Sequence, residues 1–269
     1  MKIAISQLCV PGALGEVLEK TRRWGYEALE LGVSEEGGVL NLSTPASRRK
    51  DIIRQIVDQG LSLTSLVALP VAQHSLFDHI AAERHKGQDL CRRILDMAAE
   101  MGADTILLVP GRLVSETCYD EAMTMCIESL QALAPHAEAC RVNIGIENVW
   151  NKFLVSPLDM KFLIESVHSR YVGAFVDVGN IVFWGYPEHW IRILAPYLKK
   201  IHFKDLAVRG MNLAVVPLGQ GAVNWDAVMR EIRAARYDGA LISEVEGGDD
   251  SAMADAARIM KKLVAQAGC

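Results

Sequence analysis

The sequence lacks the features that mark several classes of protein. Its six cysteines form no C-x-x-C pair, which argues against a thiolate zinc site and favours buried, reduced thiols. No apolar run approaches 18 residues, and the short apolar run after Lys2 is interrupted by Gln7, so we expect neither a membrane span nor a signal peptide. The formal net charge is −5, whereas proteins that bind the phosphate backbone of nucleic acids usually carry a basic face. These absences predict a cytoplasmic protein with no nucleic-acid partner and no membrane partner.

The sequence also shows no linker and no shift in composition, so residues 1–269 are predicted to form a single domain. Short apolar runs rich in β-branched residues alternate with segments of helical spacing. The strands are expected at residues 2–6, 26–33, 61–69, 104–109, 141–147, 171–177, 198–202 and 240–245. Eight alternations predict an α/β protein with a closed (β/α)8 TIM barrel. The alternative is an open doubly wound sheet, but the glycine-rich turn usual after its first strand is absent from residues 9–12.

Four consecutive predicted strands carry, at or next to their last residue, a side chain that can bind a metal ion, namely Glu147, Asp177, His202 and Glu244. Side chains of a barrel strand alternate between the lumen and the helix layer. In residues 141–147 the aliphatic side chains have one parity and Glu147 has the other, so Glu147 is expected to face the lumen. Each residue alone could be a helix cap, an ion-pair partner or an interior histidine. Four consecutive strand ends of this kind predict one site at the carboxyl end of the barrel, where barrel active sites lie.

Three converging carboxylates would repel one another unless a cation lay between them. We therefore expect one divalent metal ion, bound by Glu147, Asp177, His202 and Glu244. This oxygen-rich set with one imidazole favours Mn2+, with Mg2+, Co2+ and Zn2+ as alternatives. Glu30 ends a strand in a similar way but lies outside this arc, so it is interpreted as structural or as a support for a ligand.

An ordered set of motifs extends this site into a family resemblance. The motifs are IGIEN (144–148), FVDVGN (175–180), IHFKD (201–205), LGQGAVNW (218–225) and ISEVEG (242–247). Together they resemble the xylose-isomerase-like TIM-barrel superfamily of sugar isomerases and epimerases, from residue 2 to about residue 248. The resemblance implies that Glu147 and Glu244 are both metal ligands and catalytic bases.

The function implied by this resemblance is epimerisation or isomerisation of a ketose or a ketose phosphate. The metal would hold the substrate through its carbonyl and a neighbouring hydroxyl and stabilise an enediolate. One glutamate would remove the proton next to the carbonyl, and the other would return a proton to the opposite face. The expected partner is therefore a small-molecule sugar or sugar phosphate.

Further side chains are expected to bind this substrate. Arg209 stands where the family has a substrate-contacting arginine. Lys204 faces the lumen by its parity and would bind a hydroxyl or phosphate oxygen, the alternative being a salt bridge to Asp205 or Glu246. His74 lies in a loop over the same face, where it would either touch the substrate or remain a surface residue.

Two positions depart from the D-tagatose 3-epimerase type of the family, which acts on free ketoses. That type has a histidine three residues after the aspartate, where this sequence has Asn180, which we expect to contact the substrate. It also has a second glutamate six residues after Glu147, where this sequence has Phe153. Both departures argue against a free-ketose substrate, and the Asp-x-Gly-Asn form ending at Asn180 resembles the sugar-phosphate branch. The glycines of residues 219–221 could cradle a phosphate.

Aromatic side chains gather just after the fifth and sixth predicted strands. They would either line the sugar pocket or form a contact within the homo-oligomer that we expect. The residues concerned are Trp150, Phe153, Phe183 and Trp184.

Other functions are compatible with parts of the pattern. An isomerase of hydroxypyruvate or of a keto-sugar, or an inosose-type dehydratase, would use the same site. An endonuclease IV-like DNA-repair enzyme would need several metal ions and more histidines, whereas only His202 ends a predicted strand. A barrel that binds a sugar without turnover would not need two glutamate bases.

Overall fold

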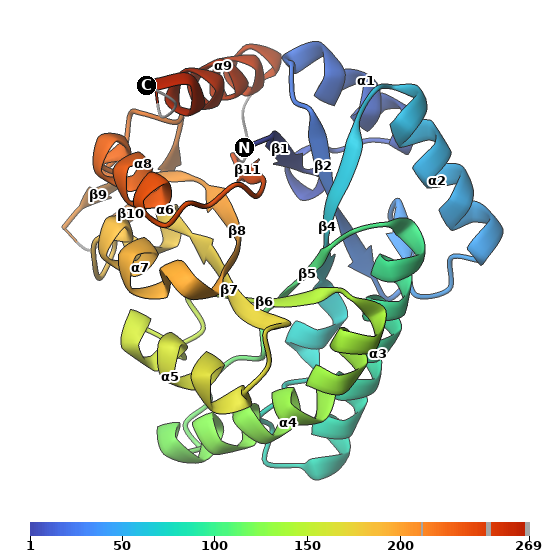
Figure 1. Ribbon diagram of the computed structural model, residues 1–269, viewed down its shortest axis with the longest axis vertical. Coiled ribbons are helices and arrows are strands. Elements are labelled where there is room, and N and C mark those ends of the chain that lie inside the picture. The colour runs from blue at the N-terminus through green and yellow to red at the C-terminus, as the bar shows by residue number, and fades with distance from the viewer. Residues whose placement is uncertain (211, 246–248, 267–269) are drawn as a thin grey trace.

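The computed structural model describes residues 1–210, 212–245 and 249–266, and a closed barrel of parallel strands lies at its centre (Figure 1). The barrel strands are β1 (Ile3–Ser6), β2 (Ala28–Ser34), β4 (Ser62–Ala68), β5 (Thr105–Leu108), β6 (Asn143–Glu147), β7 (Val172–Asp177), β8 (Leu198–Phe203) and β11 (Leu241–Ser243). Strand β1 pairs with β2 on one side and with β11 on the other, which closes the ring. The predicted (β/α)8 barrel is confirmed, and the open doubly wound sheet is excluded.

Helices surround the barrel, and the last long helix lies beside the first, so the outer ring is also complete (Figure 1). The long helices are α1 (Leu14–Trp24), α2 (Ala46–Asp58), α3 (Ala81–Met101), α4 (Tyr119–Cys140), α5 (Pro157–Val167), α7 (Pro187–Leu194), α8 (Trp225–Ala234) and α9 (Asp250–Gln266). The short elements are α6 (Val178–Ile181) and the 3-10 turns η1 (Gln7–Cys9), η2 (Leu69–Gln73) and η3 (Ala195–Tyr197).

The segment after β8 forms a structure that we did not predict. No strand was predicted between residues 202 and 240, but β9 (Asp205–Arg209) and β10 (Asn212–Val216) pair as an antiparallel hairpin. The available signal was a pair of short apolar runs on either side of Gly210, a pattern that favours a hairpin. A two-residue strand, β3 (Leu40–Asn41), also adds to the end of β2.

Local chemistry determines where the helices begin and end. Gly25 directly follows α1 and Gly102 directly follows α3, and both glycines have a positive φ. Glycine adopts this backbone conformation with little strain because it has no Cβ. Helix α5 begins with Pro157, and the Ser156 side chain accepts a hydrogen bond from its first turn. Asn224 caps α8 in the same way.

Alternation along the strands separates two apolar layers. Ile144 and Ile146 of β6 are fully buried in the large core between the sheet and the helices. Phe175 of β7 belongs to a smaller apolar cluster inside the barrel. A Cβ at Gly145 would lie 3.0 Å from the Phe175 ring, so this glycine leaves room for the ring in the lumen. The barrel interior is therefore packed with side chains, and polar groups lie above this layer.

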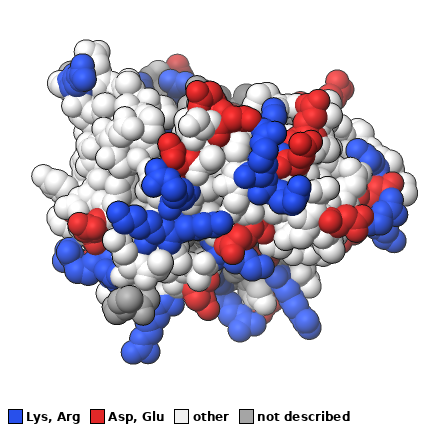
Figure 2. Space-filling view, turned by 90° about the horizontal axis from the view of Figure 1, so that it is seen from above, with Lys and Arg blue, Asp and Glu red and all other residues white. Residues whose placement is uncertain are grey.

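The surface shows no segregation of charge on the face drawn in Figure 2, where lysines and arginines are intermixed with aspartates and glutamates. Among the described residues, no helix combines the length and the apolar composition that crossing a membrane requires.

Candidate active site

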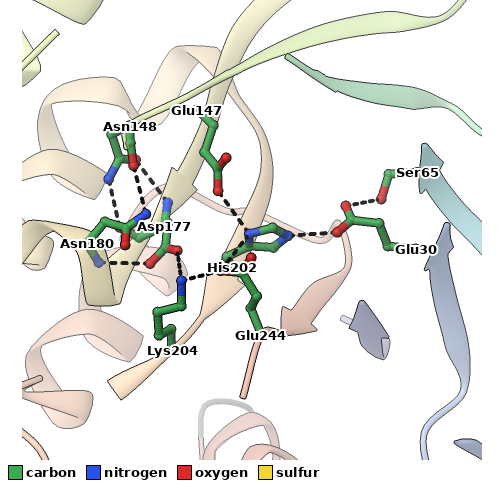
Figure 3. Close-up of polar contacts among 9 residues, drawn as sticks. All are labelled: Glu30, Ser65, Glu147, Asn148, Asp177, Asn180, His202, Lys204 and Glu244. Atoms are coloured by element: carbon green, nitrogen blue, oxygen red, sulfur yellow. Dashed lines mark hydrogen bonds and ion pairs between the residues drawn. The ribbon is translucent and has the colours of Figure 1, made fainter. Parts of the chain in front are cut away.

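The four predicted ligand residues meet at the carboxyl end of the barrel (Figure 3). Glu147 and Asp177 are the last residues of β6 and β7, His202 lies near the end of β8, and Glu244 directly follows β11. Each residue offers one ligand atom, and these atoms all lie within 4.8 Å of one another. Register in the parallel sheet explains part of this convergence, because Asp177 is directly paired with His202.

The imidazole of His202 lies at the centre of this cluster and is 1 % exposed. Its Nδ1 lies 3.1 Å from Glu147 Oε1 and 3.6 Å from Glu244 Oε2. Its Nε2 lies 3.0 Å from Glu30 Oε1. Burial works to lower the pKa of His202, but the carboxylates of Glu30 and Glu244 outweigh it and raise this pKa well above its usual value. The ring therefore lies in a strongly negative environment.

The carboxylates of the cluster respond differently to their surroundings. Burial raises the pKa of Glu147, because the charged form loses contact with water. Burial also raises the pKa of Asp177 to about 6, although Lys204 acts in the opposite direction. Burial acts in the same sense on Glu30, but the charge of His202 and its hydrogen bonds lower the pKa of Glu30 overall. Glu30 is thus held as an anion. The raised pKa values of Glu147 and Asp177 mean that the positive charge near them does not offset their burial, so a cation would stabilise their charged forms.

Lys204 supplies positive charge to the cluster. Its Nζ lies 2.6 Å from Glu244 Oε2 and 3.4 Å from Asp177 Oδ2. Burial lowers the pKa of Lys204, but these two carboxylates raise it above its usual value. Of the alternative partners considered from the sequence, Asp205 makes other contacts and Glu246 lies outside the described residues.

Asn180 and Asn148 brace the end of β7, which carries Asp177. The backbone N–H of Asn180 donates to Asp177 Oδ1 at 2.9 Å, and its side-chain nitrogen donates to the backbone oxygen of Asn148 at 3.1 Å. The side chain of Asn148 in turn both donates to and accepts from the backbone of Asp177. The bracing role of Asn148 was not predicted. Contact of Asn180 with the substrate stays a prediction, and its side-chain nitrogen already has a partner.

His74 pairs with other residues, and Arg209 is exposed. His74 Nδ1 lies 2.9 Å from Glu83 and its Nε2 lies 3.6 Å from Glu35. Arg209 is exposed at the end of β9. Neither residue has a recorded polar contact with the four ligand residues in the described part of the chain, so their roles toward substrate stay predictions.

Asp205 occupies the loop that we considered as a phosphate cradle. Its Oδ2 accepts hydrogen bonds from the backbone N–H groups of Gly219 at 2.9 Å and Gly221 at 3.0 Å, and from Trp225 Nε1 at 3.1 Å. A Cβ at Gly221 would lie 2.1 Å from Asp205 Oδ1, so the loop is closely fitted to this carboxylate. The two glycine amides that would bind a phosphate are therefore engaged by the protein itself.

The aromatic residues expected near the mouth differ in their exposure. Phe153 is 1 % exposed and packs against Phe77 and Tyr119, so it is a core residue and not a contact between subunits. Trp150 is half-exposed and donates from Nε1 to the backbone oxygen of Asn180 at 3.0 Å. Trp184 is also partly exposed.

The donor set fits a divalent metal ion. Three carboxylates and one imidazole converge within 4.8 Å, a combination that oxygen-preferring divalent ions accept. Asp177 Oδ2 and Glu244 Oε2 are buried and accept no hydrogen bond of ordinary geometry from the described residues, although Lys204 forms ion pairs with both. Oxygens of this kind are available to a cation.

Comparison with known proteins agrees with this fold. A family model described as "Xylose isomerase-like TIM barrel" matches residues 18–263. A putative L-ribulose-5-phosphate 3-epimerase from Escherichia coli (strain K12) is 22 % identical over 86 % of this chain and 82 % of that protein. The structure of a D-tagatose 3-epimerase-like protein aligns with a TM-score of 0.85 and 19 % identity, covering 100 % of this chain and 98 % of the other. A xylose isomerase-like TIM barrel protein from Mycobacterium smegmatis in complex with magnesium aligns with a TM-score of 0.78 and 18 % identity, covering 99 % and 97 %.

Proposed function

The chain belongs to the xylose isomerase-like TIM barrel family, as an enzyme of its sugar epimerase and isomerase class, and we propose that it inverts one carbon of a ketose or ketose phosphate with a divalent metal ion. The observation that carries this proposal is the convergence of Glu147 and Glu244 on one space together with Asp177 and His202. Two carboxyl groups and a metal-type ligand set in one buried site are what a proton transfer next to a carbonyl requires.

Glu147, Asp177, His202 and Glu244 would hold the metal ion. When bound, a divalent cation supplies positive charge that polarises the substrate carbonyl and lowers the cost of negative charge on its oxygen. Mn2+ is our first expectation, and the magnesium complex of a structural relative makes Mg2+ the natural second probe.

Inversion needs one base on each face of the substrate. Glu147 reaches the site from β6 and Glu244 from the end of β11, and two strands, β7 and β8, lie between them in the sheet. One carboxylate would take the proton from the carbon next to the carbonyl, and the electron pair would move toward the carbonyl oxygen. The other carboxyl group would then give a proton to the opposite face of the same carbon, so substrate and product have the same composition.

Burial suits Glu147 to that task. Glu147 is 6 % exposed, and its pKa is raised by burial, so it is a stronger base than a surface glutamate. Lys204 donates toward Glu244 and is within reach of the same space, where it would bind an oxygen of the sugar. Asn180, Arg209 and His74 remain proposed substrate contacts.

The names of the relatives support a ketose phosphate as the first substrate to assay. Because Asp205 engages the Gly219 and Gly221 amides, a phosphate group would need other donors. Free ketoses and ketose phosphates should therefore be compared side by side.

The test is a panel of ketoses and ketose phosphates in deuterated water with Mn2+, Mg2+ or Co2+, followed by NMR. The expected result is an epimeric product that carries one deuterium at the inverted carbon. Deuterium at the neighbouring carbon would instead identify an isomerase, and loss of water from the substrate would identify a dehydratase. Failure of all substrates to exchange with all three metals would refute the proposal.

A further inference from the structure

We propose that Glu30 is a positioning residue for the metal site: it holds Nε2 of His202, so that Nδ1 points into the ligand cluster. The inference rests on the proposed metal dependence, because the role of Glu30 is to orient one of the ligands. Glu30 is fully buried and would not itself touch the metal ion or the sugar.

Glu30 contacts His202 across the barrel lumen. It lies on β2, whereas His202 lies on β8, and Figure 3 shows the two side chains pointing toward each other. Glu30 Oε1 lies 3.0 Å from His202 Nε2, and Glu30 Oε2 accepts a hydrogen bond of 2.7 Å from Ser65 Oγ on β4. Both carboxylate oxygens are therefore fixed, one by the imidazole and the other by a hydroxyl from the neighbouring strand.

An irregularity in the sheet lies at the same position. The register between β2 and β4 shifts between Leu29 and Glu30. Bulges of this kind re-aim a side chain and are common next to active sites. The register shift therefore lies at the residue whose side chain projects toward His202.

The imidazole is also restrained from a second side. The ring of Phe175 lies 4.6 Å from the His202 ring in an edge-on arrangement, with an interplanar angle of 70°. With Nε2 on Glu30, the other nitrogen lies 3.1 Å from Glu147 and 3.6 Å from Glu244. A ring turned over by 180° would present carbon atoms to Glu30 and lose that hydrogen bond.

This arrangement assigns a different role to each ring nitrogen. Histidines that bind metals usually donate their other ring N–H to a carboxylate, which fixes the ring and the tautomer. Glu30 is that carboxylate, so Nδ1 is the nitrogen left to bind the cation. Ser65 supports the role by holding Glu30 in place.

Three substitutions separate position from charge. Glu30→Gln keeps an acceptor at the same place and removes the charge, because its amide oxygen can accept from Nε2 while its nitrogen donates to Ser65. Glu30→Asp keeps the charge and shortens the reach by one methylene. Glu30→Leu removes both, and Thr105→Val serves as the control, because it removes another buried hydroxyl of the barrel that is bonded to Asp104 and not to His202.

The measurement is the affinity of the metal-free protein for Mn2+ by titration calorimetry, with thermal melting as a check of folding. Glu30→Asp and Glu30→Leu should weaken binding about 10- to 100-fold, the range for carboxylates that orient a ligand. Glu30→Gln should weaken it only a few-fold, and Thr105→Val should stay within about twofold. If Glu30→Leu does not fold, the comparison of Glu30→Asp with Glu30→Gln carries the test.

Two results would overturn the inference. Binding by Glu30→Asp that equals the wild type would show that position is unimportant. Glu30→Gln weakened as much as Glu30→Leu would show that the charge of Glu30 accounts for the whole effect and that the acceptor in place does not. A wild-type protein that binds neither Mn2+, Mg2+ nor Co2+ would instead remove the proposed metal function, which is a separate failure.

Discussion

The ammonium group of Lys204 lies 2.6 Å from Glu244 Oε2, inside the cluster of residues that would bind a metal ion. It also lies 3.4 Å from Asp177 Oδ2, so one lysine partners two of the four ligand residues. A metal ion bound between these carboxylates would carry the same sign of charge as Lys204 at short range. The lysine therefore stabilises the metal-free site and would oppose a metal ion bound there.

Lys204→Met should consequently bind Mn2+ more tightly than the wild type, by about tenfold, because a like charge a few ångströms from the ion is removed. The metal-free variant should be less stable, because Asp177 and Glu244 lose their positive partner. Calorimetric titration and thermal melting measure the two effects. Lys200→Met is the matched control, since Lys200 is a buried lysine of the preceding strand β8 that pairs with Asp104 instead. Weaker Mn2+ binding by Lys204→Met would contradict this account.

Glu147→Gln and Glu244→Gln should each lower turnover by about 10²- to 10⁴-fold, the usual contribution of a general acid or base. Each variant keeps one base, so it should still exchange the substrate proton of one epimer with deuterated water more readily than that of the other. NMR of both epimers, taken separately, measures this asymmetry. Epimerisation at the wild-type rate by either variant would rule out the two-base scheme.

Removal of the metal should abolish activity and lower stability. A ligand that binds only the folded state at 100 times its Kd adds about 2.7 kcal/mol, which is roughly 5–10 °C in Tm for a chain of this size. Dialysis against a chelator and return of Mn2+ should reverse both effects. In Asp177→Asn the Mn2+-dependent shift in Tm should be much smaller, and a full shift in that variant would place the metal elsewhere.

The metal-free protein should be stabilised by Asp177→Asn in a pH-dependent way. Burial raises the pKa of Asp177 from 3.8 to about 6, so the folded state holds this proton more tightly than the unfolded state. Its contribution to stability is therefore full below pH 3.8 and is lost as the pH rises through about 6. Relative to the wild type, the variant should gain about 1.5 kcal/mol more at pH 7.5 than at pH 5. Urea unfolding of both metal-free proteins measures this difference, and a pH-independent difference would count against it.

Asp205→Asn should destabilise the fold strongly, because Asp205 accepts five hydrogen bonds in a buried position. A loss of about 3 kcal/mol is expected when a buried charged acceptor of several N–H groups is replaced, which is roughly 6–12 °C in Tm. Asp226→Asn is the control, since Asp226 is exposed in the first turn of α8 and should cost less than about 1 kcal/mol. Equal melting temperatures of the two variants would show that the Asp205 contacts are unimportant.

Much of the barrel and of the ligand set was readable from local pattern. Strand and helix alternation is a property of short segments, and the side-chain period of two in a strand assigned Glu147 and Asp177 to the lumen. Because parallel strands end at one edge, four strand-end ligands had to lie near one another. The hairpin of β9 and β10 was missed, since its short apolar runs lie in a segment without the spacing of the other units.

Contacts across the closed barrel were not readable in this way. Parity says which face a side chain occupies, but the residue opposite it depends on the tilt of the strands and on irregularities such as the register shift at Glu30. A long polar side chain can also reach several acceptors, and the fold decides which of them lies nearest. Lys204 pairs with Glu244 and not with Asp205. The sequence by itself determined the barrel and the candidate ligands at its strand ends, because both follow from local periodicity. Only the tertiary structure decided that Glu30 holds His202 and that Asp205 fills the glycine loop, because those partners are brought together by closure of the sheet and not by spacing along the chain.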